Sequence, residues 1–564
     1  MLNFRIVLCG ATIGLTACGN LLVNDVTDPD RKRVLGTPGD VETFIGATYA
    51  QIQNGTLGGS NDDIQTQMQV MGMENVSGLA NFAMGPRGSV PRAPIDNARG
   101  SQGNAGNVRD FQVLHRAARM ATLGIARLKD NVNPISLGSP ARNARALAFA
   151  RFSQGVALGD LALVYDSASI LTEFDNPQAT IPLSDYHAVM KAALAYIDSA
   201  IAIWSAPPPV GPPSDWVPSS PTTTTDTWIN GRTKTMTAAQ MVQFARSYKA
   251  RLRASVARSP LARKDSVDWN AVIGDANAGI TADFYVTMNP TAGWDVVWPA
   301  QAFATGSANW HQMSQFWLGM ADSSGAYDTW LNTPRANRVP FTVVTADRRF
   351  PQGATRTAQN AVTVAGTFAV LPYLRNRPAG EDQPGDALQV SQYDFYRTRQ
   401  FFLASRIGDY PVMTRAEIRL LAAEGYIRTG NAAAAIALID SSRTAAGLPT
   451  LASAGITDTI AAIPGAGCVP RVPNKATGYK SSTCGNAWDA LKWEYRMETM
   501  YTGYGMWYFA SRGWGDLPEG TAVSWPVPYQ EMDARAQPFY GLGGVSQLGG
   551  SGPGNYGLYS GGVF

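Results

Sequence analysis

The sequence has few charged residues and very few histidines, and these shortages exclude several classes of function. Charged residues make up 16% of the 564 residues, and the formal net charge is only +3. Because nucleic-acid binding needs clustered lysine and arginine, and no basic stripe is present, a nucleic-acid partner is not expected. The three histidines, His115, His187 and His311, lie far apart, so they and the cysteines do not predict a zinc site.

Long apolar runs are also scarce, and the clearest one lies at the N-terminus. After it, no run reaches the ~20 residues that a membrane-spanning helix needs. The stretch Ile6–Leu15 is of signal-peptide length, and Thr16 and Ala17 then precede Cys18. Small residues before a cysteine are what a lipoprotein signal peptidase accepts. The pattern predicts a signal peptide over residues 1–17, a lipid on Cys18 and a polar tether over residues 18–36. An ordinary signal peptide followed by a chance cysteine is the alternative.

Only four cysteines are present, and two of them belong to the N-terminal segment. Cys9 leaves with the signal peptide and Cys18 takes the lipid. Cys468 and Cys484 remain and flank a polar loop. Because an exported protein meets an oxidising compartment, the two are expected to form a disulfide. Two free thiols are the alternative.

Helical periodicity dominates what the sequence does contain. Small residues recur at facing positions of the periodic segments, which favours helix pairs that stack closely. The sequence therefore predicts a mainly α fold with a tetratricopeptide-like helical-repeat scaffold over residues 37–279 and 407–540. The segments expected to be helical are Pro38–Gln53, Asn107–Asn131, Ser139–Tyr165, Asp185–Trp204, Thr237–Arg258, Pro411–Arg428 and Ala432–Ala446.

Between residues 280 and 406 the helical period is lost, and Trp, Tyr, Gly, Asn and Pro become frequent. The segment is expected to be a loop-rich insertion with short strands such as Val362–Leu371, within a single domain over residues 37–540. Residues 541–564 form a Gly-rich tail that is expected to be weakly structured on its own.

Aromatic density in this insertion is the strongest indication of a binding site. An indole face on a loop can support the C–H face of a sugar ring while neighbouring polar groups hold its hydroxyls. The alternative is that these rings anchor the insertion to the helices, because large aromatics dominate core energetics. The candidates for ligand binding are Trp294, Trp298, Trp310, Trp317, Tyr327 and Trp330.

Catalytic constellations are not found in the sequence. Glu417 and Glu424 lie seven residues apart, hence ~10 Å along a helix, whereas a retaining glycosidase needs carboxyl groups roughly 5 Å apart. They are better interpreted as capping or ion-pairing groups, and Glu494, Arg496 and Glu498 as a structural charge network. No cofactor is expected, although Asn61-Asp62-Asp63 could hold a structural Ca²⁺.

Several segments resemble the SusD/RagB family of outer-membrane lipoproteins. They follow the N-terminal lipidation motif in the family's order, over about half of the chain. Thr502, Gly505 and Tyr508 depart from the family pattern, which marks a divergent member. The segments are Ala141–Tyr165, Tyr410-Pro411-Val412 with Glu417 and Glu424, Arg443 with Ala446–Pro449, Trp493–Glu498, Arg512–Gly515, and Trp525–Pro528 with Glu531.

The resemblance implies a binding protein without catalytic activity on the outer face of the outer membrane. Such proteins cap a TonB-dependent, SusC-like transporter and present a glycan or oligosaccharide, or in some members a peptide, for import. A surface glycoside hydrolase and a purely structural scaffold are the alternatives from other classes.

Overall fold

The long helices begin at the capping residues that the sequence contains. In a computed structural model, Ser139, Asp185 and Thr237 accept hydrogen bonds from the first-turn N–H groups of α7 (Pro140–Val164), α8 (Tyr186–Ser205) and α9 (Ala238–Ser255). Thr237 and Gln240 form a capping box. The residues described are 35–59, 63–76, 84–101, 103–176, 179–207, 210–221, 236–296, 312–382, 390–465 and 468–564.

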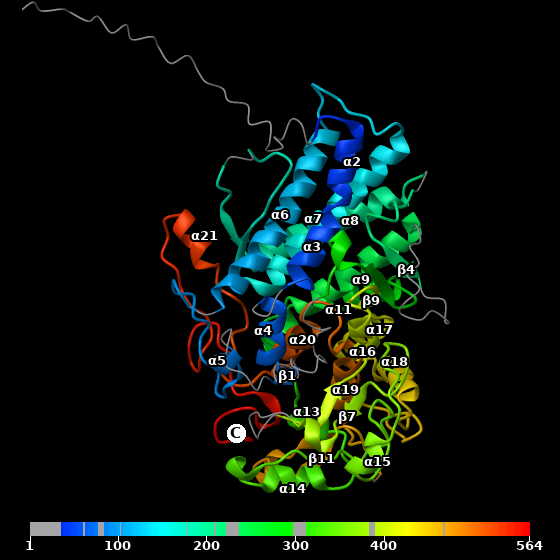
Figure 1. The fold of residues 1–564 in the computed structure, drawn as a ribbon, viewed down its shortest axis with the longest axis vertical. Coiled ribbons are helices and arrows are strands. Elements are labelled where there is room, and N and C mark those ends of the chain that lie inside the picture. The colour runs from blue at the N-terminus through cyan, green and yellow to red at the C-terminus, as the bar shows by residue number, and fades with distance from the viewer. Residues whose placement is uncertain are drawn as a thin grey trace, which may run out of the picture.

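One half of the molecule is a stack of antiparallel helices around α7 (Figure 1). The expected helix Pro38–Gln53 is instead two helices that meet at Ala47. By length and composition α7 and α8 could cross a membrane, but 94% of the apolar stretch of α7 is buried inside the protein. Helix α7 packs against α8, α9 and three others: α2 (Pro38–Gly46), α3 (Thr48–Thr56) and α6 (Asn104–Leu128).

Glycines on α7 explain why these helices lie so close together. A Cβ on Gly155 would lie 2.6 Å from Ile197 of α8, and one on Gly159 would lie 2.6 Å from Leu252 of α9. The small residues predicted at facing positions therefore act as contact points between helices.

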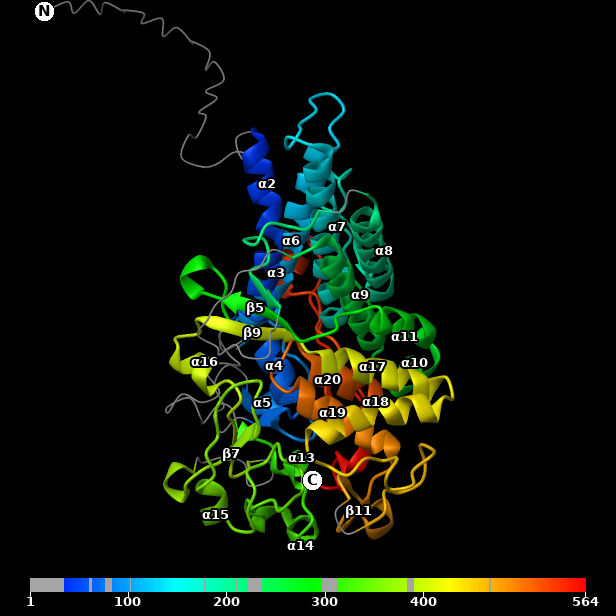
Figure 2. The same cartoon turned by 90° about the vertical axis from the view of Figure 1, so that its right-hand side faces the viewer.

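A second group of helices continues the scaffold (Figure 2). The expected helix Pro411–Arg428 is wrong at its start, because Pro411 lies in strand β9 (Gly408–Met413) and Thr414 caps the helix. Pro is tolerated there because β9 is the edge strand of the sheet β4-β5-β9, with β4 (Ser219–Pro221) and β5 (Phe284–Met288). The helices are α10 (Pro260–Asp265), α11 (Trp269–Asn277), α17 (Arg415–Arg428), α18 (Ala432–Ala445), α19 (Ala487–Thr499) and α20 (Met506–Trp514).

The loop-rich insertion lies at the far end from α2 and has short elements only (Figures 1 and 2). The strand expected over Val362–Leu371 is not formed: this run is irregular, and Gly366 has a φ of +74°, which a strand does not accommodate. The elements are β6 (Gln312–Met313), α13 (Gln315–Gly319), α14 (Ala326–Asn332), α15 (Arg356–Asn360), β7 (Leu374–Asn376), β8 (Tyr393–Phe395) and α16 (Arg399–Leu403).

Two apolar cores result. The larger one fills the helical scaffold, and the smaller one joins the insertion to α19, α20 and the C-terminal tail. The tail was expected to be weakly structured, but Leu558 and Val563 are buried in the smaller core.

The remaining elements are α4 (Ile64–Met71), β1 (Asn75–Val76), α5 (Met84–Gly88), β2 (Ser167–Ser169), β3 (Leu183–Asp185), β10 (Arg471–Pro473), β11 (Ser482–Cys484), α21 (Tyr529–Ala534) and five short 3₁₀ turns among the described residues.

Candidate ligand pocket

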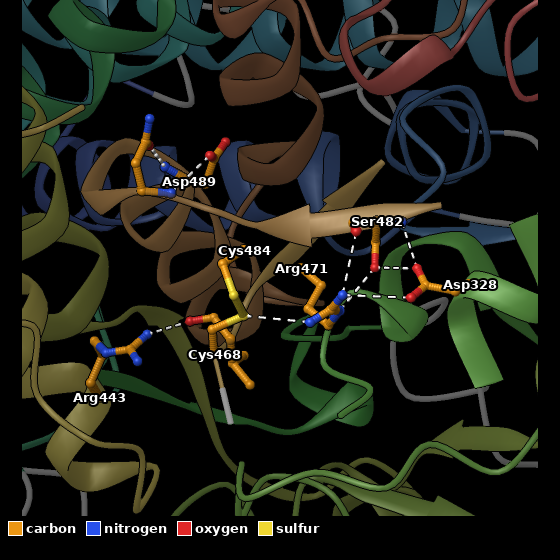
Figure 3. The surroundings of a disulfide bond; sticks show 9 residues. Asp328, Arg443, Cys468, Arg471, Ser482, Cys484 and Asp489 are labelled. Atoms are coloured by element: carbon orange, nitrogen blue, oxygen red, sulfur yellow. Dashed lines mark hydrogen bonds and ion pairs between the residues drawn. A yellow bond between two sulfur atoms is a disulfide. The ribbon is translucent and has the colours of Figure 1, made fainter. Parts of the chain in front are cut away.

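Cys468 and Cys484 form a disulfide, as expected from the sequence. It lies beside the hairpin β10–β11, where Arg471 pairs with Cys484 (Figure 3). Asp328 of α14 accepts hydrogen bonds from the backbone N–H and hydroxyl of Ser482, both at 2.5 Å. The disulfide therefore lies where the insertion meets the helical scaffold.

The carboxylates of the family-like segments are held in buried ion pairs. Arg251 of α9 donates to both oxygens of Glu417, at 2.6 and 2.7 Å. Arg263 does the same for Glu424, at 2.8 and 2.7 Å. Burial raises the pKa of the Glu424 carboxyl, but Arg263, Arg428 and Trp514 together lower it by more, so that it lies below its ordinary value. These groups are connectors between helices, which confirms their interpretation as ion-pairing residues.

Glu494 and Glu498 form a similar network at the boundary with the insertion. The Arg349 guanidinium donates to Asp347, Glu494 and Glu498 over distances of 2.7–3.2 Å. Burial raises the pKa of the Glu494 carboxyl, and Arg349 only partly offsets this. Glu494 and Glu498 thus belong to a structural charge network, as expected, with the insertion residue Arg349 at its centre. Arg496 was expected in the same network but pairs instead with Asp516.

The structure does not place the predicted aromatic platform on the surface. Trp294 is enclosed in the larger core near Tyr49, and Trp317, Tyr327 and Trp330 are enclosed in the smaller core. None of these four is more than 7% exposed. A sugar cannot stack on an enclosed ring, so the alternative, in which these rings anchor the insertion, is the correct one for these positions.

Several predicted sites lie outside the described residues. These are Cys18, Trp298, Trp310 and the Asn61-Asp62 part of the possible Ca²⁺ loop. Asp63 is described, and its carboxylate accepts hydrogen bonds from the N–H and hydroxyl of Thr66 as the cap of α4. Within the described ranges, no group of three or more His, Cys, Asp or Glu side chains is arranged to hold a metal.

A pocket of about 520 Å³ opens between α6, the β2–β3 connection and α21. Its α6 wall is one helix face, because Gln112, His115, Arg116 and Arg119 follow helical spacing. Figure 1 shows α21 beside α6 at the edge of the helical stack. The other lining residues are Phe111, Ser169, Leu171, Ala179, Thr180, Ile181, Glu531, Ala534 and Arg535.

His115 is a fixed part of this pocket. Its Nε2 accepts a hydrogen bond from the Ser169 backbone N–H at 3.2 Å, so the ring proton must be on Nδ1. Nδ1 donates to the Phe111 carbonyl at 2.8 Å. Burial is the main cause that lowers the pKa of His115 to about 4, so the ring is neutral at physiological pH. With both nitrogens engaged, His115 holds β2 against α6, as expected for a packed histidine.

The charges of the pocket are unbalanced. Among the described residues, Glu531 is the only acidic member of the lining, and Arg535 engages it at 2.7 Å. Arg116 and Arg119 are also in the lining, and neither guanidinium group makes an ion pair or hydrogen bond with any described residue. The lining thus has three guanidinium groups against one carboxylate.

A second hollow, of about 610 Å³, has balanced charges. It lies beside Leu35 and Gly36, and its Arg127 and Asp130 pair with each other at 3.8 Å. Because Arg127 and Asp130 pair with each other, this hollow offers a ligand fewer unpaired charged groups than the pocket on α6 does.

Sequence reasoning missed the arginine-lined pocket. The available signal was the pair Arg116 and Arg119 on the outer face of a helix whose other face is apolar. The closing side, with Arg535, is more than 400 residues away in the chain, so no local pattern shows that the three meet.

The sequence matches no family model, and no curated protein sequence matches it. A SusD homolog from Parabacteroides distasonis has a similar structure, with a TM-score of 0.52, 12% identity, and coverage of 88% of this chain and 93% of that one. SusD superfamily proteins from Bacteroides thetaiotaomicron and Bacteroides vulgatus align with TM-scores of 0.49 and 0.46, each at 12% identity. They cover 90% and 89% of this chain, and 98% and 90% of their own. The likeness to the Parabacteroides distasonis protein confirms the resemblance at the level of structure: this chain has the SusD fold.

Proposed function

We propose that the chain is a cell-surface lipoprotein that binds a glycan or oligosaccharide and delivers it to a TonB-dependent, SusC-like outer-membrane transporter. The observation that carries the proposal is the combination of a lipidation motif at Cys18 with the SusD fold behind it. In this proposal residues 1–17 are removed as a signal peptide, residues 18–36 tether the folded chain, and acyl chains on Cys18 hold it at the membrane.

The proposed role is binding without catalysis. Glu417, Glu424 and Glu494 are three carboxylates of the family-like segments, and each is buried against an arginine. Carboxylates held in this way support the packing of helices and do not face a ligand. The arginine-lined pocket on α6 is the proposed ligand site among the described residues, since it is open, polar and of ligand size.

The test is affinity purification of the tagged, lipidated protein from detergent-solubilised outer membranes, with its partners identified by mass. We expect a β-barrel transporter in stoichiometric amount. Recovery of the lipoprotein alone, under conditions that preserve other membrane complexes, would contradict the transport role.

A Cys18→Ala variant tests the anchor in the same strain. Metabolic labelling with a fatty-acid analogue is expected to mark the native chain and to be absent from the variant, which should leave the membrane fraction. A variant that remains in that fraction without label would show that another contact holds it there.

A further inference from the structure

The pocket on α6 has a chemical preference that the fold does not prescribe. Arg116 and Arg119 lie three residues apart on one helix face. Like charges at this spacing repel each other. Because no carboxylate among the described residues compensates them, an anion between the two guanidinium groups would relieve that repulsion.

Arg535 faces the same space from α21 and is held in place. Its Nε donates to Glu531 at 2.7 Å, one Nη to the Ile181 carbonyl at 2.9 Å and the other to the Ser169 hydroxyl at 3.1 Å. The Nη that donates to Ser169 also lies 2.7 Å from Glu531 Oε1, so four of the five N–H groups are engaged and one remains for a ligand. The side chain is only 11% exposed, so it needs little ordering when a ligand binds.

The rest of the lining suits a ring with both apolar and polar faces. Ile181 is half-buried and Ala179 and Ala534 are exposed, so these three supply the accessible apolar contacts, whereas Gln112 and Thr180 supply neutral hydrogen-bonding groups. The volume of about 520 Å³ lies within the range of small-molecule sites. An arginine fork binds planar or tetrahedral anions with paired hydrogen bonds.

We propose that this pocket binds an acidic oligosaccharide, with its anionic group between Arg116, Arg119 and Arg535 and a sugar ring against the apolar wall. This ligand class rests on the glycan-binding function proposed above. The anionic group is a carboxylate, as in a uronic acid, or a sulfate ester; both match the guanidinium groups.

The experiment is calorimetric titration of the full lipidated chain in detergent with paired oligosaccharides. The uronate ligands are oligomers of galacturonate, mannuronate and glucuronate, and each is compared with its carboxyl-reduced form. Each sulfated oligosaccharide is compared with its desulfated form. We expect at least one acidic member to bind about tenfold or more tightly than its neutral counterpart, with an affinity that falls as salt is raised.

The double variant Arg116→Gln/Arg119→Gln assigns the effect to the pocket. It should reduce the affinity for the acidic ligand to that of the neutral counterpart, whereas Lys191→Gln/Lys264→Gln, which removes the same charge from exposed positions, should not. Since neither arginine makes an ion pair, the variant is expected to keep the thermal unfolding temperature of the native protein.

Other outcomes separate this inference from the proposed function. Tight binding of a neutral oligosaccharide, unchanged in the double variant, would overturn the inference and leave the glycan-binding function in place. Binding of inorganic phosphate or sulfate alone, with no oligosaccharide, would overturn both. Loss of the transporter in the double variant, with acidic-ligand affinity retained, would reassign the pocket as a contact with the transporter and overturn the inference.

Discussion

Arg512 is a buried guanidinium that contacts carbonyl groups from three segments. It donates to the carbonyls of Leu163 at 2.9 Å, Val523 at 2.6 Å and Ser255 at 2.8 Å. Leu163 and Ser255 are in the last turns of α7 and α9, where the helix dipoles place partial negative charge. Burial lowers the pKa of Arg512 to about 9, which still leaves it charged at neutral pH. The residue thus joins the C-terminal ends of two helices to α20.

We expect Arg512→Met to lower the free energy of unfolding by about 3–5 kcal/mol, because three buried carbonyls would lose their donor. Chemical denaturation followed by circular dichroism measures the change. Lys264→Met, at an exposed position on α10, is the control and should have little effect. A similar loss in both variants would show that the carbonyl contacts of Arg512 contribute nothing specific.

Glu74 is a buried carboxyl group whose burial raises its pKa to about 8 from an ordinary value of 4.5. One oxygen accepts a hydrogen bond from the Tyr501 backbone N–H at 2.6 Å, which only partly offsets the burial. The folded protein therefore keeps this proton at neutral pH, whereas the unfolded chain has lost it.

The sign of the pH dependence follows from this difference. The stabilisation by protonated Glu74 is fully present below about pH 4.5 and is lost progressively up to about pH 8, at ~1.4 kcal/mol per pH unit. Glu74→Gln keeps an acceptor for Tyr501 but cannot ionise. Relative to the native protein, its free energy of unfolding should therefore increase steadily across this window. The exposed substitution Glu381→Gln is the control, and parallel curves for the native protein and Glu74→Gln would contradict the assignment.

At the scale of elements, α4 shows how a buried helix can connect through its polar side chains. Every residue from Ile64 to Met71 is buried. Gln65 accepts a hydrogen bond from the Gly505 N–H, and Gln67 accepts one from the Trp525 indole while donating to Asn107. The alternating Gln and apolar residues in this segment do not indicate a helix by period. The segment is helical because Asp63 caps its first turn and the surrounding helices pack against it.

The hairpin β10–β11 is the element in which the disulfide has its effect. Cys468 and Cys484 are 16 residues apart, and closing such a loop restricts the unfolded chain by about 3 kcal/mol in the simple entropy model. The double variant Cys468→Ser/Cys484→Ser should lower the free energy of unfolding by about that amount. Denaturation of the native protein with a reductant should give the same decrease. The pocket on α6 is formed by other elements, so ligand affinity should not change; a parallel loss of affinity would contradict this separation.

At the scale of the whole molecule, two cores share α19 and α20. The insertion supplies most of the smaller core, and the C-terminal tail completes it with Leu558 and Val563. Tyr556 of the tail also donates a hydrogen bond to Asp489 of α19 at 2.6 Å. The insertion and the tail are therefore held together through the helical scaffold.

Removal of residues 541–564 should expose the smaller core and destabilise the insertion more than the helical stack. Limited proteolysis is expected to cut the truncated chain within residues 312–382 while the region around α7 stays resistant. Leu558→Ala/Val563→Ala in the full chain should produce a weaker version of the same pattern, with about 2–5 kcal/mol lost for the buried leucine alone. Uniform digestion of both halves would show that the two cores unfold as one unit.

The sequence by itself determined the features that depend on local chemistry. Ser139, Asp185 and Thr237 begin helices because a side-chain oxygen can satisfy the first free N–H groups wherever it precedes an apolar period. The spacing of Glu417 and Glu424 excluded a retaining glycosidase pair and left capping or ion pairing, and the pairing of Cys468 with Cys484 was expected from the exported context.

Only the tertiary structure decided which side chains face solvent. Trp317 and Trp330 have the composition of a binding platform, but their environment depends on α19, α20 and the tail, which lie far away in the chain. The pocket was hidden for the same reason, because Arg116 and Arg535 meet only when α21 packs against α6. The burial of a side chain and the charge balance of a pocket depend on contacts between segments that are distant in the chain. The spacing of residues along one segment therefore does not predict them.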